Sequence, residues 1–301
     1  MAATLRAVRT RIRAVQSISK ITRAQELIAS SRIVRAQQRM RAADPYARGL
    51  TEAVSALVSR TTSINHPMVT RPDTIRKASV LVLTSDSGFA GSYNANVLRE
   101  SARLRERLAA DRTPVDLYVA GRKGIGWHRF RDLALADEWS GFSARPDYSN
   151  AEQITQRLLE NFGPEGEVDE IYLVGTEFVS MLTQRPVVRR LLPLEITESS
   201  DEPAGGPLPP YEFEPSPDIV FDALLPQYVA SRVFFALLEA AASELAARRR
   251  AMKAATDNAN DLLSRLTLEA NKARQAEITQ EISEIVGGAN ALAEANAGSE
   301  E

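Results

Sequence analysis

The chain has 301 residues, 37 Lys and Arg against 39 Asp and Glu, and 44% hydrophobic residues, a balance ordinary for a soluble globular protein. It has no cysteine and only two histidines, His66 and His128, which excludes a disulfide framework, a thiol nucleophile and a Cys- or His-rich metal site. No apolar run approaches 18 residues, so we expect no membrane span.

Glycine and proline, the residues that break helices, are unevenly distributed. All 15 glycines and all 15 prolines lie outside residues 1–44 and 227–286. Continuous helices over these two stretches would be about 65 and 90 Å long. Helices in globular proteins average about 11–12 residues, so the distribution argues against a simple globular enzyme.

The N-terminal stretch predicts an amphipathic helix with an apolar face. Its apolar residues repeat at spacings of three and four, which is typical of a coiled-coil seam. The seam that we predict consists of Leu5, Val8, Ile12, Val15, Ile18, Ile21 and Ile28. Pro45 predicts an end or a kink, because the residue before a proline is pushed out of helical geometry. The apolar pattern resumes at Leu50 and stops near Asn65.

The same stretch carries most of the positive charge. Residues 1–50 hold eleven Lys and Arg and only two acidic residues. Such a run is either a solvated face or a surface for an acidic partner or nucleic acid. Residues 1–45 contain no Phe, Trp or Tyr on which bases could stack, which argues against nucleic acid.

The middle of the chain alternates between predicted strands and helices, which implies a small, largely parallel α/β sheet. The predicted strands are 78–83, 115–120, 169–174 and 187–196, and the predicted helices are 95–110 and 150–162.

Two Gly-rich turns in this region could hold an anion. Ser85 to Ser92 lies between a strand and a helix, and the turn from Gly121 to Gly126 is basic. Neither turn matches a dinucleotide or Walker pattern, so tight structural turns are the simpler interpretation. His128 has aromatic neighbours and is better explained by packing than by acid–base chemistry.

The C-terminal stretch has a helix start signal, with Ser216 as N-cap and Pro217 in the first turn. Pro226 predicts a kink or local break, and Gly287-Gly288 predicts a stop. A stripe with a seven-residue repeat lies between them: Leu245, Met252, Ala259, Leu266 and Ala273. The two long helices either wind together as an antiparallel coiled coil, which we favour, or pack separately on the middle domain.

Several segments resemble the gamma subunit of F-type ATP synthases. The resemblance covers nearly the whole chain, and the C-terminal motifs are its most specific part. The matching segments are Val15–Arg32 (VQSISKITRAQELIASSR), Thr84–Asn94 (TSDSGFAGSYN), Met252–Ala259 (MKAATDNA) and Asn271–Ala289 (NKARQAEITQEISEIVGGA).

The resemblance implies an antiparallel coiled coil of the N- and C-terminal helices with an inserted Rossmann-like α/β domain. The expected parts are an N-terminal helix 1–65, an α/β domain 75–200, a Pro/Gly-rich loop 201–216, a C-terminal helix 217–288 and an acidic tail 289–301.

The resemblance also implies a function, that of a central rotor shaft without catalytic residues, cofactor or metal of its own. Its partners would be the alpha and beta subunits, which carry the chemistry on beta, the epsilon subunit and the membrane c-ring. Such a chain would lie at the cytoplasmic face of the cell membrane, without spanning it, and would couple proton transport to ATP synthesis. An α/β nucleotide-binding enzyme and a basic coiled-coil nucleic-acid-binding protein are the alternatives.

Motif positions imply which residues contact the surrounding ring. Basic residues of the family's helices meet an acidic segment of beta, and polar residues contact the ring near the upper part of the shaft. The candidates are Lys20, Arg23, Gln25, Arg248, Gln275, Thr279 and Glu281. Many members have Met where this chain has Gln25, and Cys is common in the turn where Phe89-Ala90 stand here.

Overall fold

The protein is described here by a computed structural model that covers residues 2–60, 66–194 and 217–297. The chain folds into two compact units: unit 1 consists of Met1–Leu27 with Ala251–Glu301, and unit 2 is Ile28–Arg250. The helices are α1 (Ala2–Arg60), α2 (Tyr93–Ala110), α3 (Arg122–Arg129), α4 (Tyr148–Leu159) and α5 (Pro217–Ala297). The strands are β1 (Ala78–Leu83), β2 (Val115–Ala120), β3 (Asp137–Trp139), β4 (Glu170–Phe178) and β5 (Gln184–Leu192).

Unit 2 contains one five-stranded sheet in the order β3-β2-β1-β4-β5. The first four strands are parallel to their neighbours, and β5 pairs antiparallel with β4. The order reverses between β1 and β4, as in doubly wound nucleotide-binding folds. The prediction of a Rossmann-like, largely parallel sheet is therefore confirmed, with an antiparallel hairpin strand at one edge.

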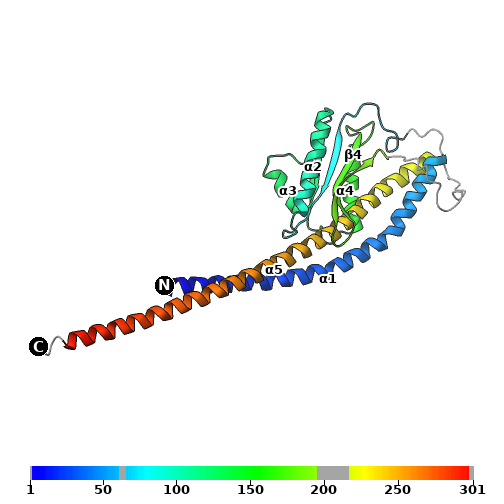
Figure 1. Cartoon of the computed structure of the whole chain (residues 1–301). Coiled ribbons are helices and arrows are strands. Elements are labelled where there is room, and N and C mark those ends of the chain that lie inside the picture. Colours follow the sequence, from blue (N-terminus) through cyan, green and yellow to red (C-terminus); the bar gives the residue numbers. More distant parts are fainter. Residues whose placement is uncertain (1, 61–65, 195–216, 298–301) are drawn as a thin grey trace. The chain divides into compact units, whose positions relative to one another are not determined.

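Helices cover both faces of this sheet (Figure 1). Val80 and Val82 of β1 pack with α2 and α3. Leu81 and Leu83, which point to the other face, pack with α4 and with residues 229–240 of α5. All six residues of β1 are buried, as expected for a central strand covered on both sides.

Within unit 2, α1 and α5 also pack against each other. Ile33 and Ala36 share an apolar cluster with Leu245, and Leu57 shares another with Phe221. Helix α1 does not end at Pro45, and α5 contains Pro226 within its run. Both helices continue through their prolines, so the predicted end of the N-terminal helix at Pro45 and the local break at Pro226 are wrong. Packing along each helix outweighs the cost of the missing N–H donor.

In unit 1 the two helices pair through a seam that matches the prediction on α5, where Met252, Ala259 and Leu266 are buried, and differs from it in part on α1. Leu5 and Val8 are buried as expected, whereas Ile18 and Ile21 are exposed. The contact is made instead by Thr22, whose Oγ1 lies 2.7 Å from Oγ1 of Thr256. One turn away, Ser19 donates to Asn260 Oδ1 at 3.0 Å.

This difference has a simple reason. Residues 12, 15, 19, 22 and 26 keep the heptad spacing, and the apolar residues at 18 and 21 lie one position away from it. The apolar pattern therefore points to Ile18 and Ile21, whereas the heptad spacing places the polar residues Ser19 and Thr22 in the seam.

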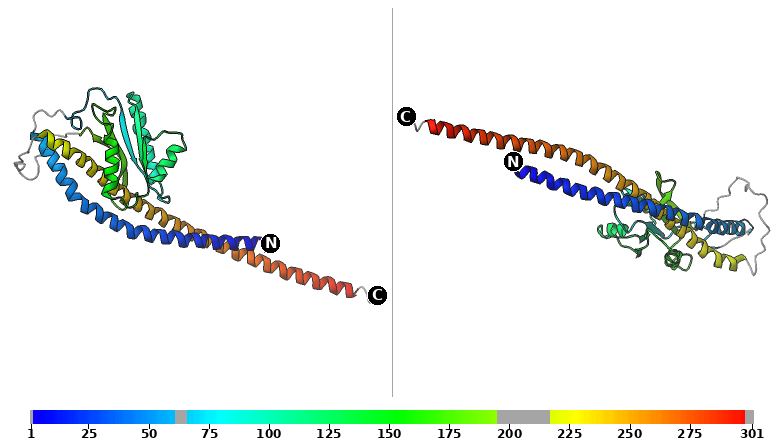
Figure 2. Two further views of the ribbon diagram at one scale, coloured as in Figure 1. Left: turned by 180° about the vertical axis from the view of Figure 1, so that it is seen from behind. Right: turned by 90° about the horizontal axis from the view of Figure 1, so that it is seen from below.

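Helix α5 is longer than the sequence indicated. It runs through Gly287-Gly288 to Ala297, so the predicted stop is wrong. Figure 2 shows its C-terminal part continuing beyond the N-terminus of α1. The predicted N-cap Ser216 and the loop 201–216 lie outside the described residues. Within the described residues, no helix has the length and apolarity needed to cross a membrane.

Gly121 gives a direct test of how β2 connects to α3. Its φ is +107°, and a Cβ there would overlap with the Thr84 carbonyl. We expect Gly121→Ala to lower the free energy of unfolding by about 3 kcal/mol or more, from backbone strain and steric overlap together. The measurement is urea unfolding of the full chain.

The matched control is Gly126→Ala in α3, where a Cβ would meet nothing within 4 Å. An alanine in a helix interior is favoured over glycine by up to about 1 kcal/mol, so this variant should be at least as stable as the parent. Equal effects of the two substitutions would contradict the geometry of the turn.

Candidate functional site

Three of the candidate contact residues lie on the unit 1 part of α1. Lys20, Arg23 and Gln25 are all exposed. Arg23 has an ion pair with Glu26 at 3.2 Å, and its own side chain stays 60% exposed. An ion pair this exposed contributes little to stability, so these cations are available to a partner.

The other polar candidates lie on α5, near its C-terminal end. Gln275, Thr279 and Glu281 are exposed. The Thr279 hydroxyl donates to the Gln275 carbonyl at 2.9 Å within the helix. The structure therefore places six of the seven candidates on open helix surface, in two groups on α1 and α5.

Large apolar side chains accompany both polar groups. On α1, Ile18, Ile21 and Leu27 are exposed, with Ile21 at 61%. On α5, Ile278, Ile282 and Ile285 lie one turn apart and are exposed, with Ile285 at 71%. Isoleucines one helical turn apart form a continuous apolar stripe, and an exposed stripe of this kind is typical of an interaction surface.

Arg248 is different from the other candidates, because its guanidinium is already engaged within the chain. The residue is only 9% exposed, and Nη2 donates to Glu244 Oε1 at 2.6 Å. The same nitrogen makes longer contacts, of 3.3–3.4 Å, with the carbonyls of Ser87 and Gly88. The structure therefore places Arg248 under the β1–α2 turn and not on an open face.

Glu244, the partner of Arg248, is 1% exposed. Burial raises the pKa of this carboxyl above its ordinary value, although the Arg248 charge and hydrogen bond act in the opposite direction. Through this pair, α5 fixes the turn that presents Phe89. Phe89 is 78% exposed and has a φ of +61°, an unusual backbone conformation for a bulky residue.

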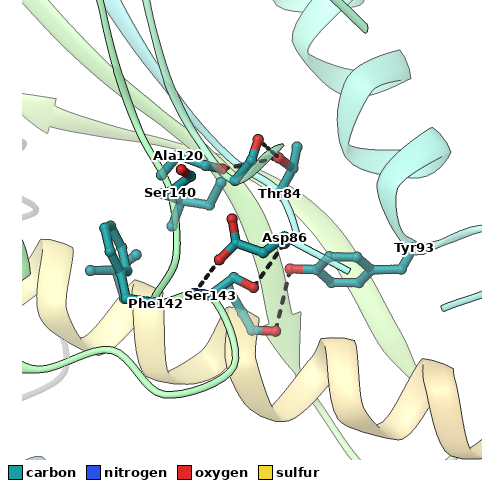
Figure 3. Close-up of a pocket in the computed structure, with 11 residues that line it drawn as sticks. Thr84, Asp86, Tyr93, Ala120, Ser140, Phe142 and Ser143 are labelled. Carbon is teal, nitrogen blue, oxygen red and sulfur yellow. Dashed lines mark hydrogen bonds between the residues drawn. The ribbon is translucent and has the colours of Figure 1, made fainter. Parts of the chain in front are cut away.

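The backbone amides that lie beside the β1–α2 turn, at the start of α3 and in the loop after β3, already donate to Asp86 of that turn. Its carboxylate accepts from the backbone N–H groups of Arg122, Gly141 and Ser143 at 2.9–3.1 Å. Figure 3 shows Asp86 beside Ser143, one of these three partners. Burial acts to raise the pKa of Asp86, but these backbone hydrogen bonds outweigh it and the net pKa is lowered. The carboxylate of Asp86 thus stands where an external anion would bind.

The space beside Asp86 is also too small for a substrate. The cavity lined by Asp86, Tyr93 and Phe142 has a volume of about 10 Å³, enough for about one water molecule. The basic turn after Gly121 forms α3, whose Gly124 N–H is bonded to Thr84 Oγ1 at 3.0 Å. The β1–α2 turn and the turn after Gly121 therefore both serve the fold, which agrees with their interpretation as tight structural turns.

His128 is engaged within the fold. His128 is buried, its Nδ1 lies 2.8 Å from the Gly124 carbonyl, and burial lowers its pKa. Among the described residues no group of three His, Cys, Asp or Glu could hold a metal ion.

Comparison with known proteins decides between the remaining interpretations. The family model described as ATP synthase matches residues 4–292. The chain is 55% identical over 296 residues to an ATP synthase gamma chain of Frankia casuarinae, covering 97% of this chain and 99% of the relative. It is 56% identical over 297 residues to that of Kineococcus radiotolerans, covering 97% and 98%.

The chain belongs to the ATP synthase gamma chain family. Solved structures confirm the fold of this family member. A chain of the Euglena gracilis mitochondrial ATP synthase (OSCP/F1/c-ring) superposes with a TM-score of 0.69 at 15% identity, covering 97% of this chain and 95% of that chain. A chain of the rotor of that ATP synthase gives 0.64 at 14% identity, covering 92% and 100%. The resemblance noted in the sequence is thus confirmed.

The sequence did not reveal the buried Glu244–Arg248 pair or the internal role of Asp86. A charged pair at i and i+4 in a helix is common, so its spacing alone does not distinguish buried pairs from exposed ones. The Ser85-to-Ser92 motif was recognised, but its partners Gly141 and Ser143 lie more than fifty residues further along the chain.

The Glu244–Arg248 pair predicts a pH-dependent mutant phenotype. Arg248→Met leaves a buried carboxylate without its counter-ion, which should cost about 3–5 kcal/mol of unfolding free energy at neutral pH. A carboxyl with a raised folded-state pKa contributes stability that is present in acid and lost as the pH rises through that pKa. Without Arg248 the pKa rises further, so the deficit of the variant should shrink as the pH falls.

The control is the double variant Glu244→Gln with Arg248→Met, which removes the buried charge altogether. Its unfolding free energy should lie much closer to that of the parent and its difference from the parent should vary little with pH. A pH-independent deficit in Arg248→Met, or an equally unstable double variant, would refute this account of the pair.

Proposed function

We propose that this chain is the central rotor shaft of an F-type ATP synthase and couples rotation of the c-ring to the catalytic cycle of the beta subunits. Membership of the gamma chain family over residues 4–292 is the observation that carries the proposal. The chain would act without catalytic residues of its own, with catalysis on beta. It would work within a membrane-associated complex, at the cytoplasmic face.

The helices have the physical properties that a shaft needs. Helix α1 has 59 residues and α5 has 81, each an unbroken helical run. In unit 1, Thr22 and Thr256 join them side by side. Two paired helices resist bending and twisting better than one helix or a loop does, so torque at one end is transmitted along them.

Unit 1 exposes features that a surrounding partner would cover. In the part of unit 1 that the structure describes, only four large apolar side chains are buried: Leu5, Val8, Met252 and Leu266. Because so few apolar side chains are buried, the hydrophobic effect contributes little to the stability of unit 1 by itself. The exposed isoleucines of both helices supply further apolar area, which a sleeve formed by the alpha and beta subunits would bury.

The exposed cations give the shaft a positively charged surface that an acidic partner could bind. We propose that Lys20 and Arg23 face an acidic segment of beta, with Gln25 beside them. Gln275, Thr279 and Glu281 would contact the ring nearer the upper end of the shaft. Arg248 would act indirectly, because it holds the β1–α2 turn and presents Phe89 instead of meeting a partner itself.

The α/β domain of unit 2 supplies the remaining partner surfaces in this proposal. The epsilon subunit and the c-ring would bind to unit 2. The structural neighbours come from mitochondrial enzymes described with a c-ring and an F1 part, which supports an assembly of this kind.

Reconstitution tests the proposal directly. Alpha and beta subunits are assembled with this chain, without it, or with the Lys20→Glu/Arg23→Glu variant. We expect sustained ATP hydrolysis only with the chain. In vesicles carrying the whole complex, the charge-reversed variant should lose about tenfold in proton-driven ATP synthesis, because two new carboxylates would repel an acidic partner; a tenfold loss is about 1.4 kcal/mol.

Lys20→Arg/Arg23→Lys is the matched control, since it keeps a positive charge at both exposed positions of α1. It should leave ATP synthesis near the parental rate. The rotor assignment is wrong if the complex assembles and sustains hydrolysis without the chain. The proposed role of Lys20 and Arg23 is wrong if the charge-reversed complex and the charge-keeping complex synthesise ATP equally well.

A further inference from the structure

Unit 2 contains a second cavity that is unrelated to the β1–α2 turn. It has a volume of about 510 Å³, within the range of sites that bind small molecules. Four of its lining residues are arginines, and none is acidic: Arg32, Arg35, Arg39 and Arg145. Its apolar lining includes Ala36 of α1 and Leu238 of α5.

The arginines come from two separate elements. Arg32, Arg35 and Arg39 have spacings of three and four on α1, so they share one face of the helix. Arg145 lies in the loop between β3 and α4. This loop is held in place by Asp86, which accepts from its Gly141 and Ser143 amides.

Only one of the four guanidiniums has a charged partner among the described residues. Arg39 donates to Asp147 Oδ1 and to the Pro146 carbonyl, both at 2.8 Å, and so joins α1 to the loop. No carboxylate of residues 2–60, 66–194 and 217–297 lies within ion-pair distance of Arg32, Arg35 or Arg145. Three cations therefore face one cavity without a carboxylate partner in the part of the chain that the structure describes.

This arrangement is unfavourable without a counter-ion. Like charges one helical turn apart destabilise a helix by a few tenths of a kcal/mol, and because Arg32, Arg35 and Arg145 are exposed, water and salt screen part of this repulsion. An anion that met all three guanidiniums would remove the repulsion. Arginine forks bind phosphate oxygens with two parallel hydrogen bonds, which makes phosphate the best-matched chemistry.

We propose that this cavity binds a polyphosphate, either free or as the tail of a nucleotide. A polyphosphate carries several negative charges within a short length, so one molecule can contact several of the clustered arginines. An acidic peptide spreads its carboxylates over a longer chain, and a cavity of 510 Å³ holds only a short part of one. This site is independent of the proposed rotor function.

Calorimetric titration of the full chain with inorganic triphosphate tests the proposal. We expect one saturable site per chain. Arg32→Gln/Arg35→Gln should weaken binding by about tenfold for each guanidinium removed. Arg145→Gln, on the opposite wall, should weaken it about tenfold as well, and it keeps the test valid if the α1 variant does not fold.

Arg9→Gln/Arg13→Gln is the control, because it removes the same charge from exposed positions of α1 in unit 1. This variant should bind triphosphate like the parent at the same salt concentration. A parallel titration with ATP separates the two sources: tighter binding of ATP than of triphosphate indicates a nucleotide, and equal binding indicates a free polyphosphate.

Three results would overturn the proposal. The first is no saturable binding of either ligand, and the second is an equal loss in the cavity and control variants, which would mean diffuse attraction to a basic helix. The third is tight binding of an oligoglutamate peptide by a chain that does not bind triphosphate, which would make the cavity a site for an acidic protein segment.

Discussion

The pairing of α1 with α5 is the constraint on which the rest of the structure depends. Two stretches without glycine or proline can form very long helices, but such helices are stable only when one face is covered. In unit 1 the covered face combines a few large apolar side chains with polar pairs, Thr22 against Thr256 and Ser19 against Asn260. Because the large isoleucines are not used in this pairing, they remain exposed and give the helices an outer apolar surface.

The α/β domain uses charged groups for structure where related folds use them for ligands. Its strand order places a Gly-rich turn at the sheet position where doubly wound folds bind nucleotides. Here Asp86 of that turn accepts from amides of neighbouring loops, and Arg248, paired with Glu244, ties the turn to α5. The turn is thus bonded within the fold, while three arginines without a carboxylate partner among the described residues line a different cavity, between α1 and the β3–α4 loop.

Much of this architecture follows from the sequence, because long helices and buried central strands have strong local patterns. The breaker-free stretches predicted α1 and α5, and β1 was evident as a continuous apolar run. The extent of each helix was less predictable. Pro45, Pro226 and Gly287-Gly288 are local signals, and tertiary packing or helix continuity overrides them. The six exposed residues proposed to contact the ring, such as Lys20 and Glu281, follow from the family resemblance and not from a local structural pattern. The burial of Arg248 depends on a contact with residues 160 positions away, which no local pattern contains.

The central claim is that α1 and α5 turn as one paired shaft, and a disulfide across their seam tests it most directly. The chain has no cysteine, so Thr22→Cys/Thr256→Cys introduces the only two thiols, at positions whose hydroxyl oxygens lie 2.7 Å apart. In the reconstituted complex we expect oxidation to cross-link the two helices within one chain and to leave proton-driven ATP synthesis intact. Failure to form the cross-link, or a loss of synthesis on oxidation that reductant restores, would contradict the account.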